Sequence, residues 1–580
     1  MAGQGTLVLP HEAEAEEHLF QCPLFRFLPP EVQEQCRRNV HLLRYLHALP
    51  TGQLGVPRFH TTLSRKLGDM KPYNLLYPVS EEVFIHVVTA PKEERPLYIP
   101  VEPIFAVRLE DVLPKIEERL LDLAGEFAAA KTAEEKTQAL LTALEKVCKV
   151  SPGNGNGNGK GSRKRIFLLP TNEQNSKVHL TPQQFAAVKY LMVRDKVGLG
   201  VLQPMISDKY IEDISCSGLG FVFLEHKVFK SMKSTIHFAT HEQLDRFVLR
   251  LSEQIKRPVT MRNPIVDAIL PDGSRVNIVY GREVSQRGSN FTIRKFNETP
   301  LSIFELIEFG TLDYRMAAYL SILLEEGMNL FVSGETASGK TTALNAITIF
   351  VPPEAKIVTI EDTPEIQVPH QNWVREVAKA PRAGEKGATV TMMDLLKAAL
   401  RQRPNLIIIG EIRGEEGAIA FQAMQTGHAV MATFHASTVE RLIQRLTGHP
   451  INIPKTYIDN LNAVLIMSAV RLPNGKTGRR ALSISEIVGY DPPSNTFSFV
   501  EVFRWDPVRD AFEFIGDKNS YLLEQKVATR RGLVGNRKWE IYNLLERRAK
   551  VLEKLHKEKG IKDYYELFRI LAQARREGLF

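Results

Sequence analysis

A glycine-rich stretch at residues 334–341, with the sequence GETASGKT, constrains the fold of this chain more than any other segment. A largely apolar run at residues 329–333 precedes it, and a helix-forming run at residues 342–347 follows it. This is the order of strand, loop and helix that a phosphate-binding Walker A loop requires. The glycines let the backbone bend around a polyphosphate, while the loop amides and the helix N-terminus point toward its negative charge. The stretch therefore predicts a nucleoside triphosphate site.

Two residues of this loop carry the predicted chemistry. Lys340 is expected to reach the β- and γ-phosphates, and the hydroxyl of Thr341 is expected to hold Mg2+. The guanine-recognition motif Asn-Lys-x-Asp does not occur in the sequence, so ATP is the preferred nucleotide. The residues of this stretch that are predicted to bind the cofactor are Gly334, Glu335, Thr336, Ala337, Ser338, Gly339, Lys340, Thr341 and Thr342.

Length and composition bound the rest of the molecule. A chain of 580 residues is too long for one hydrophobic core, so three or four domains are expected. No apolar run approaches the roughly 18 residues that span a bilayer, and the first residues lack the features of a signal peptide. The four cysteines form no Cys-x-x-Cys pair, and the net charge of +8 permits docking on an anionic membrane or an acidic partner. We therefore expect a cytoplasmic protein.

Residues 1–150 contain no recognisable functional motif and are predicted to form an accessory α+β region. Apolar residues at helical spacing within residues 111–127, and a capping box formed by Thr132 and Glu135, predict two helices in it. Docking of a partner and a purely packing role are both open for this region. An alternation of glycine and asparagine then predicts a flexible linker over residues 151–175.

Residues 176–300 are predicted to form a smaller α+β domain. A strand and turn are expected at residues 213–224, and an amphipathic helix at residues 241–255. A hairpin around a Pro-Asp-Gly turn is expected at residues 267–279, followed by a strand at residues 291–296.

Three arginines of this domain, Arg262, Arg275 and Arg294, are candidates for contacting nucleotide phosphates across an interface. An arginine supplied from outside a pocket can complete a phosphoryl-transfer site. For each of the three taken alone, a surface salt bridge is the alternative.

The next domain, residues 301–510, has an acidic segment after its second predicted strand. This strand, at residues 356–365, ends in the carboxylates of Glu361, Asp362 and Glu365. Carboxylates at the carboxyl end of a parallel strand, beside a phosphate site, can orient Mg2+ or the attacking water.

Two further strands of this domain also end in polar residues. One ends in Glu411, in the form of a Walker B strand with glutamate in place of the usual aspartate, and Arg413 follows it. The other, at residues 429–436, starts after His428 and ends in His435. Zinc binding by the two histidines is disfavoured because no third ligand lies at a suitable spacing, so His435 is interpreted as a γ-phosphate sensor or a link to a neighbouring subunit.

The predicted fold class of this domain is α/β. Helices are predicted between its strands at residues 392–401 and 415–426. Parallel strands with polar ends near one pocket, and helices between them, describe a RecA-like doubly wound sheet.

Four sequence boxes follow one another in this domain: the glycine-rich loop, the acidic box at residues 361–365, the strand end at residues 409–416 and the histidine box at residues 427–438. Together they resemble the secretion ATPase superfamily, which drives type II secretion, type IV pilus assembly and retraction, type IV secretion and the archaellum. The amino-acid sequences of these boxes and of residues 450–454 look most like those of the archaeal branch of archaellum and pilus assembly ATPases. The resemblance covers residues 190–510.

The resemblance implies a hexameric ring that hydrolyses ATP between a PAS-like α+β domain and the RecA-like motor domain. It implies that Thr341 and Glu411 hold Mg2+ and that Glu365 polarises the attacking water. Lys340, Glu365, Glu411 and Arg294 are the implied catalytic residues. The remaining predicted nucleotide contacts are Glu361, Asp362, Arg413, His428, His435, Arg262 and Arg275.

The resemblance also implies the partners of the chain. Work would be delivered to an integral membrane platform protein by a motor that is peripheral to the inner face of the cell membrane, and nucleic acid is not expected as a partner. A DNA-translocating type IV secretion ATPase and a non-cycling, ATP-gated scaffold are the alternatives. The presence of Lys340, Thr341, Glu365 and Glu411 together argues against the scaffold. The filament or cargo, and the direction of movement, remain open.

Residues 511–580 are predicted to form a helical extension. Apolar residues recur at helical spacing over residues 541–555 and 564–571, with charged residues between them. Packing against the core, or into a helical hairpin, is one interpretation of these stripes, and docking on the membrane platform is the other. Before the extension, a hairpin is predicted over residues 464–488.

Overall fold

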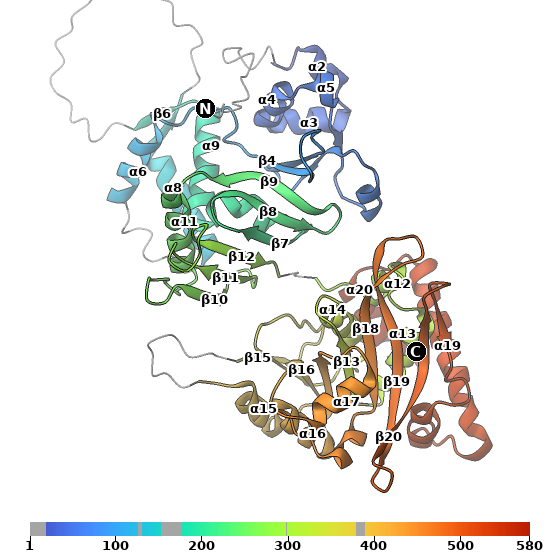
Figure 1. The fold of residues 1–580 in the computed structure, drawn as a ribbon. Coiled ribbons are helices and arrows are strands. Elements are labelled where there is room, and N and C mark those ends of the chain that lie inside the picture. The colour runs from blue at the N-terminus through green and yellow to red at the C-terminus, as the bar shows by residue number, and fades with distance from the viewer. Residues whose placement is uncertain are drawn as a thin grey trace, which may run out of the picture. The chain divides into compact units, whose positions relative to one another are not determined.

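The computed structural model describes residues 19–123, 125, 130, 132–151, 177–296, 299–378 and 389–580. The chain is a mixed α/β protein with two large mixed β-sheets, one in each of two compact units, Met1–Phe296 and Asn297–Phe580 (Figure 1). The predicted linker lies almost entirely outside the described residues, and the division of the chain into five segments stays a prediction.

The first unit is built on a ten-stranded sheet. Strands from both sides of the predicted linker share this sheet, because β4 pairs in parallel with β9 through Leu97 with Lys233 and Tyr98 with Ser234. In sheet order the strands are β1 (Arg58–Phe59), β2 (Asn74–Pro78), β3 (Phe84–Val88), β4 (Leu97–Val101), β9 (Lys230–Phe238), β8 (Gly220–His226), β7 (Ile211–Cys216), β12 (Asn290–Arg294), β11 (Arg275–Val279) and β10 (Ile265–Ile269).

One face of this sheet packs on a helix, as the alternation of its residues predicts. Val276, Ile278 and Ile293 are fully buried and share a core with Leu244 and Val248 of α11. The predicted helix at residues 241–255 and the hairpin at residues 267–279 are thereby confirmed, as is the capping box of Thr132 and Glu135. The α-helices among the described residues of this unit are α2 (Pro23–Phe27), α3 (Pro30–Arg38), α4 (Val40–Ala48), α5 (Thr51–Leu54), α6 (Leu113–Asp122), α8 (Ala133–Val147), α9 (Pro182–Met192), α10 (Gln203–Ser207) and α11 (His241–Gln254). Two short strands, β5 (Cys148–Val150) and β6 (Val178–Leu180), pair in parallel.

The second unit is built on a nine-stranded sheet. The first six strands in sheet order run parallel, and the remaining strands form an antiparallel meander. The hairpin predicted over residues 464–488 is the pair β18 and β19. In sheet order the strands are β15 (Trp373–Val377), β14 (Ile357–Glu361), β16 (Leu406–Ile412), β17 (Ala429–Phe434), β13 (Leu330–Gly334), β18 (Ala463–Arg471), β19 (Thr477–Asp491), β20 (Thr496–Asp506) and β21 (Ala511–Phe514).

Helices cover both faces of the parallel part of this sheet (Figure 1). Along β16, Leu406 and Ile408 point into one core, while Ile407 and Ile409 point into the other. The first core contains α12 (Ile303–Glu308), α13 (Tyr314–Glu325), α14 (Lys340–Ile347), α19 (Glu540–Lys557) and α20 (Tyr564–Arg576), and the second contains α15 (Met392–Arg401), α16 (Glu416–Gln425) and α17 (Val439–Thr447). A short helix, α18 (Ala528–Arg530), precedes α19.

The C-terminal helices belong to the core of the second unit. Leu545 and Leu552 of α19 and Leu567 and Leu571 of α20 are buried against it. Of the two interpretations of these stripes, core packing is the one observed. In the part of the chain that the structure describes, no helix is both long enough and apolar enough to span a membrane.

Candidate functional site

The glycine-rich loop joins β13 to α14 at the carboxyl edge of the parallel strands, as predicted. A Cβ on Gly334 would lie 2.2 Å from the carbonyl oxygen of Met467 in the neighbouring β18. Gly339, the N-cap of α14, has a φ of 91°, in the left-handed region that favours glycine. A side chain at either position would disturb the path of the loop, so both glycines are needed for its shape.

Lys340 is the first residue of α14 and is folded back over the loop. Its Nζ donates a hydrogen bond to the carbonyl of Glu335 at 2.8 Å, and Oγ of Ser338 donates to the same carbonyl at 2.7 Å. Burial lowers the pKa of Lys340, an effect that the nearby carboxylates of Glu411 and Glu365 partly offset. These two carboxylates therefore lie within electrostatic reach of the lysine.

The acidic segment after β14 is organised around the side chain of Glu361. Its Oε1 accepts hydrogen bonds from the main-chain amides of Glu365 and Ile366, both at 2.7 Å. Among the described residues, none donates to its buried Oε2, which lies 3.8 Å from Nε of Arg375. Burial raises the pKa of Glu361 to about 7. Glu361 thus shapes the loop that carries Glu365, whose own side chain is exposed.

Glu411, Arg413 and His435 lie close together at the carboxyl end of β16. Nη2 of Arg413 donates to Oε2 of Glu411 at 2.6 Å, and Nη1 of Arg413 donates to Oδ2 of Asp362 at 3.4 Å. Nε2 of His435, at the end of β17, lies 3.0 Å from Oε1 of Glu411. Three neighbouring strands therefore place polar groups together, as the sequence predicts for Glu411, Asp362 and His435.

The charges of this group affect one another. Burial would raise the pKa of Glu411, but the hydrogen bond from Arg413, the charges of Arg413 and Lys340, and His435 when it is protonated lower it overall. Burial, followed by the charge of Lys340, lowers the pKa of His435. The site thus combines an ionised carboxylate at Glu411 with a histidine that stays neutral at neutral pH.

His428 does not join this group. It precedes β17, whereas His435 follows it, and a strand of this length separates its two ends by about 20 Å. Nδ1 of His428 lies 3.1 Å from Oγ1 of Thr426 at the opposite edge of the sheet. The resemblance to the histidine box of the family grouped the two histidines, but the strand between them carries them to opposite edges of the sheet.

The three arginines proposed to reach the nucleotide lie in the first unit. Arg275 donates from Nε and Nη2 to both carboxylate oxygens of Asp267, at 3.0 and 2.6 Å. Nε of Arg294 donates to Oδ1 of Asp213 at 3.3 Å, and Arg262 is exposed. In this unit, Arg275 and Arg294 therefore form surface ion pairs, which were the alternative to a contact with nucleotide phosphates.

Two contacts of the loop were not predicted. Nε of Arg479, on β19, donates to the carbonyl of Ala337 at 3.0 Å, and its Cδ is the atom nearest to a Cβ built on Gly339. Asn345 of α14 donates from Nδ2 to the carbonyl of Glu365 at 3.1 Å and accepts from the amide of Gln367 at 3.2 Å. Neither residue belongs to a sequence motif, so only the tertiary fold could reveal these contacts.

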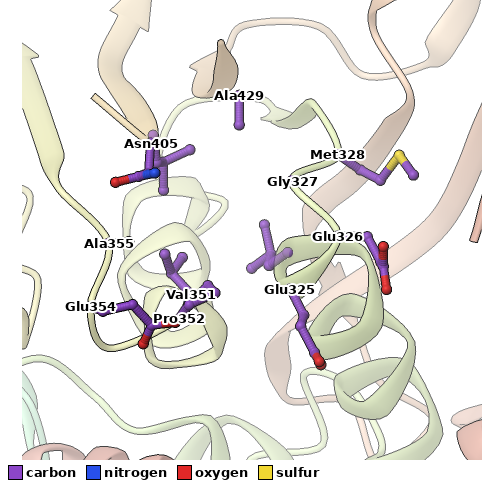
Figure 2. A pocket seen from close by; sticks show the side chains of 12 residues that line it. Glu325, Glu326, Gly327, Met328, Val351, Pro352, Glu354, Ala355, Asn405 and Ala429 are labelled. Atoms are coloured by element: carbon purple, nitrogen blue, oxygen red, sulfur yellow. The ribbon is translucent and has the colours of Figure 1, made fainter. Parts of the chain in front are cut away.

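A pocket of about 350 Å³ lies at the opposite edge of the sheet, and no residue of the glycine-rich loop lines it. Figure 2 shows the side chains that line this pocket. Two of its carboxylates are engaged, because Arg531 forms ion pairs with Glu325 at 3.1 Å and with Glu326 at 2.7 Å. Met328, Val351 and other apolar side chains line the rest of it.

Comparison with known proteins identifies relatives for both units. The sequence model of the family described as "Type II/IV secretion system protein" matches residues 195–485. An uncharacterized protein of Methanocaldococcus jannaschii is 42% identical over 550 residues, which cover 95% of this chain and 97% of that protein. The type IV secretion system protein PtlH of Bordetella pertussis is 30% identical over 272 residues, which cover 43% of this chain and 79% of PtlH.

Among solved structures, the Legionella pneumophila ATPase DotB is similar to this chain at 18% identity, with a TM-score of 0.37 over 63% of this chain and 92% of DotB. The match to the family model covers half of the chain, and the match to the archaeal relative covers nearly all of it. This chain therefore belongs to the type II/IV secretion system ATPase family.

Proposed function

We propose that this chain hydrolyses ATP in a Mg2+-dependent reaction and so powers a type IV pilus-like or type II secretion-like machine. The observation that carries the proposal is the position of Lys340, Glu411 and the Glu365 segment at the carboxyl ends of three parallel strands of one sheet, β13, β16 and β14. Ligands of open parallel sheets bind at this edge. Membership of the secretion ATPase family supports the same reaction.

The loop fits a polyphosphate. Lys340 is held over the loop by a hydrogen bond to one of its carbonyls, so its ammonium is already directed into the space that the loop encloses. Gly334 leaves space for the carbonyl of Met467, and Gly339 supplies the positive φ from which α14 begins. The residues that would bind the nucleotide are those of the loop and the start of α14, from Gly334 to Thr342.

The same site fits Mg2+, which typically takes one or two protein carboxylates or hydroxyls together with phosphate oxygens and waters. Thr341 and Glu411 would hold the ion, and the lowered pKa of Glu411 keeps its carboxylate ionised for this role. When bound, the ion would neutralise charge on the transferred phosphoryl group.

The carboxylate of Glu365 would orient the attacking water. Glu361 and Asn345 fix the main chain of Glu365 while its side chain stays exposed, an arrangement that suits a group that must meet a substrate. His435 and Arg413 would respond to the γ-phosphate through their shared partner Glu411.

The wider assembly is also part of the proposal. In a homohexamer, Arg294, with Arg262 or Arg275, would reach the nucleotide across an interface between a PAS-like domain and a RecA-like motor domain. Arg275 and Arg294 would first have to leave their surface ion pairs. The motor would act on an integral membrane platform protein at the inner face of the cell membrane. Similarity over almost the whole length to an archaeal protein supports the archaeal branch of archaellum and pilus ATPases.

Phosphate release from ATP by the purified chain tests this function. We expect release that requires Mg2+, stops with a chelator and is slower with GTP. Arg471→Ala, at the exposed end of β18, removes a surface arginine that makes no hydrogen bond to the loop among the described residues, so it is the matched control and should keep the rate. Retention of ATP without phosphate release, with or without added lipid, would leave the nucleotide-gated scaffold as the function.

A further inference from the structure

One buried hydroxyl of α20 touches both the helix of the glycine-rich loop and the segment that carries Glu365. Tyr564, the first residue of α20, is only 1% exposed. Its hydroxyl lies 2.6 Å from Oγ1 of Thr348 and 3.3 Å from the main-chain carbonyl oxygen of Gln367. Thr348 is the C-cap of α14, and Gln367 follows Glu365 by two positions. Tyr564 therefore bridges two segments that flank the candidate site.

The hydrogen bonds continue from Tyr564 to the main chain of Glu365. Oγ1 of Thr348 donates to the carbonyl of Asn345 at 2.7 Å. The side chain of Asn345 then binds the carbonyl of Glu365 and the amide of Gln367, at 3.1 and 3.2 Å. Tyr564, Thr348 and Asn345 thus form one connected set that holds the Glu365 segment against α14.

Further contacts keep α20 in register with this set. The ring of Phe568, one turn after Tyr564, lies 4.8 Å from the ring of His370, centroid to centroid. Nη2 of Arg575 donates to the carbonyl of Phe350 at 2.5 Å. Because α20 is attached at its start, middle and end, the hydroxyl of Tyr564 has a defined position rather than a rotatable one.

Tyr564 is too far from the phosphates to contact them. Thr348 lies two helical turns beyond Lys340, a rise of about 12 Å along α14. We propose that Tyr564 is a positioning residue that fixes Glu365 for ATP hydrolysis, which places the C-terminal helices among the parts that set the rate. This inference rests on the proposed function.

Tyr564→Phe removes the hydroxyl and keeps the buried ring, so the fold should be retained. We expect the turnover number of the full chain to fall about three- to tenfold, as for the loss of one hydrogen bond that places a reacting group. The KM for Mg-ATP should stay within about twofold, because the glycine-rich loop is unchanged. Thr348→Val should act in the same direction, and combining it with Tyr564→Phe should add little. Tyr565→Phe changes the neighbouring tyrosine, a residue that is 39% exposed, and is the matched control that should keep the rate.

Two readouts separate positioning from a general loss of stability. Amide hydrogen exchange at Glu365, Ile366 and Gln367 should be faster in Tyr564→Phe, while the amides of β13 keep their protection. In a Glu365→Gln background, Tyr564→Phe should change the residual rate by less than about twofold, because the group that it positions is gone.

A rate for Tyr564→Phe equal to that of the unmodified chain, with turnover present in both, would overturn the positioning role and leave the proposed function intact. An equal loss in the Glu365→Gln background would show a purely structural role and also overturn it. Absence of ATP turnover in the unmodified chain would contradict the proposed function, and the positioning role of Tyr564 would fall with it.

Discussion

Nη2 of Arg413 donates a hydrogen bond to Oε2 of Glu411 at 2.6 Å, so the carboxylate that is proposed to hold Mg2+ is shared with an arginine of the same strand end. The exposed guanidinium also reaches Asp362, at 3.4 Å. Arg413 therefore connects the acidic segment after β14 with the end of β16, and it is one cause of the lowered pKa of Glu411.

Arg413→Gln should raise the pKa of Glu411, because a hydrogen bond from a charged donor and a nearby positive charge are removed. Activity that requires the ionised carboxylate would then be lost at a higher pH as the solution is acidified. The pH profile of kcat/KM measures this shift. If the acid limb of this pH profile is unchanged in Arg413→Gln, then protonation of Glu411 does not cause the loss of activity at low pH.

Glu361→Gln should change how stability depends on pH. Burial raises the pKa of Glu361 to about 7, so between about pH 4.5 and 7 the folded chain holds a proton that the unfolded chain has lost. The contribution of Glu361 to stability is therefore complete below pH 4.5 and is lost as the pH rises through 7, by about 3 kcal/mol in all.

Glutamine keeps the acceptor for the amides of Glu365 and Ile366 and has no proton to lose. Relative to the unmodified chain, Glu361→Gln should gain stability between pH 5 and pH 8. Thermal unfolding of both proteins across this range is the measurement. Parallel curves for the two proteins would contradict the raised pKa.

Arg479→Ala should weaken nucleotide binding by freeing the carbonyl of Ala337 and uncovering Gly339. A loop that has lost one fixed conformation binds with lower apparent affinity, since part of the binding energy must order it. We expect the Kd for Mg-ATP to rise about three- to tenfold, with a smaller effect on kcat. Arg471→Ala, on the neighbouring strand, serves as the control. An equal rise in Kd in both variants would show that the effect comes from the loss of a positive surface charge and not from the contact with Ala337.

Asp208→Ala should destabilise the first unit strongly. Asp208 accepts hydrogen bonds from the hydroxyls of Tyr77 on β2, at 2.6 Å, and Tyr98 on β4, at 3.0 Å, and it is buried. Alanine would leave both buried hydroxyls without this acceptor, at a cost of about 2–5 kcal/mol. Urea unfolding followed by tyrosine fluorescence should show an earlier transition. An unchanged midpoint of urea unfolding would mean that the hydrogen bonds from Tyr77 and Tyr98 to Asp208 do not stabilise the ten-stranded sheet.

The parts of the molecule that sequence predicts well are local. The glycine-rich loop, the helices at residues 392–401 and 415–426 and the hairpin at residues 267–279 depend on neighbours along the chain, and all of these elements are present. Polar residues at strand ends were also predictable, because parallel strands bring their carboxyl ends to one edge. Glu411 and His435 meet for this reason.

The remaining features depend on pairings between distant segments. Nothing near Leu97 or Lys233 indicates that β4 and β9 pair, so the shared ten-stranded sheet could not be predicted. Arg479 reaches the loop only because β19 follows β18 beside β13. Tyr564 looks like one more apolar position of a helical stripe, and its hydroxyl gains a role only when α20 docks beside Thr348.

ATP turnover by the purified chain and by Lys340→Ala and Glu411→Gln, measured together with the mass of the assembly, tests the central claim most directly. We expect Mg2+-dependent, cooperative turnover by a six-subunit species, with the rate reduced at least about 100-fold in both variants. Lys340→Ala should also lose ATP affinity, whereas Glu411→Gln should keep it. A monomer that binds ATP tightly without turnover, or variants that retain the rate of the unmodified chain, would contradict the account of this protein as a ring ATPase.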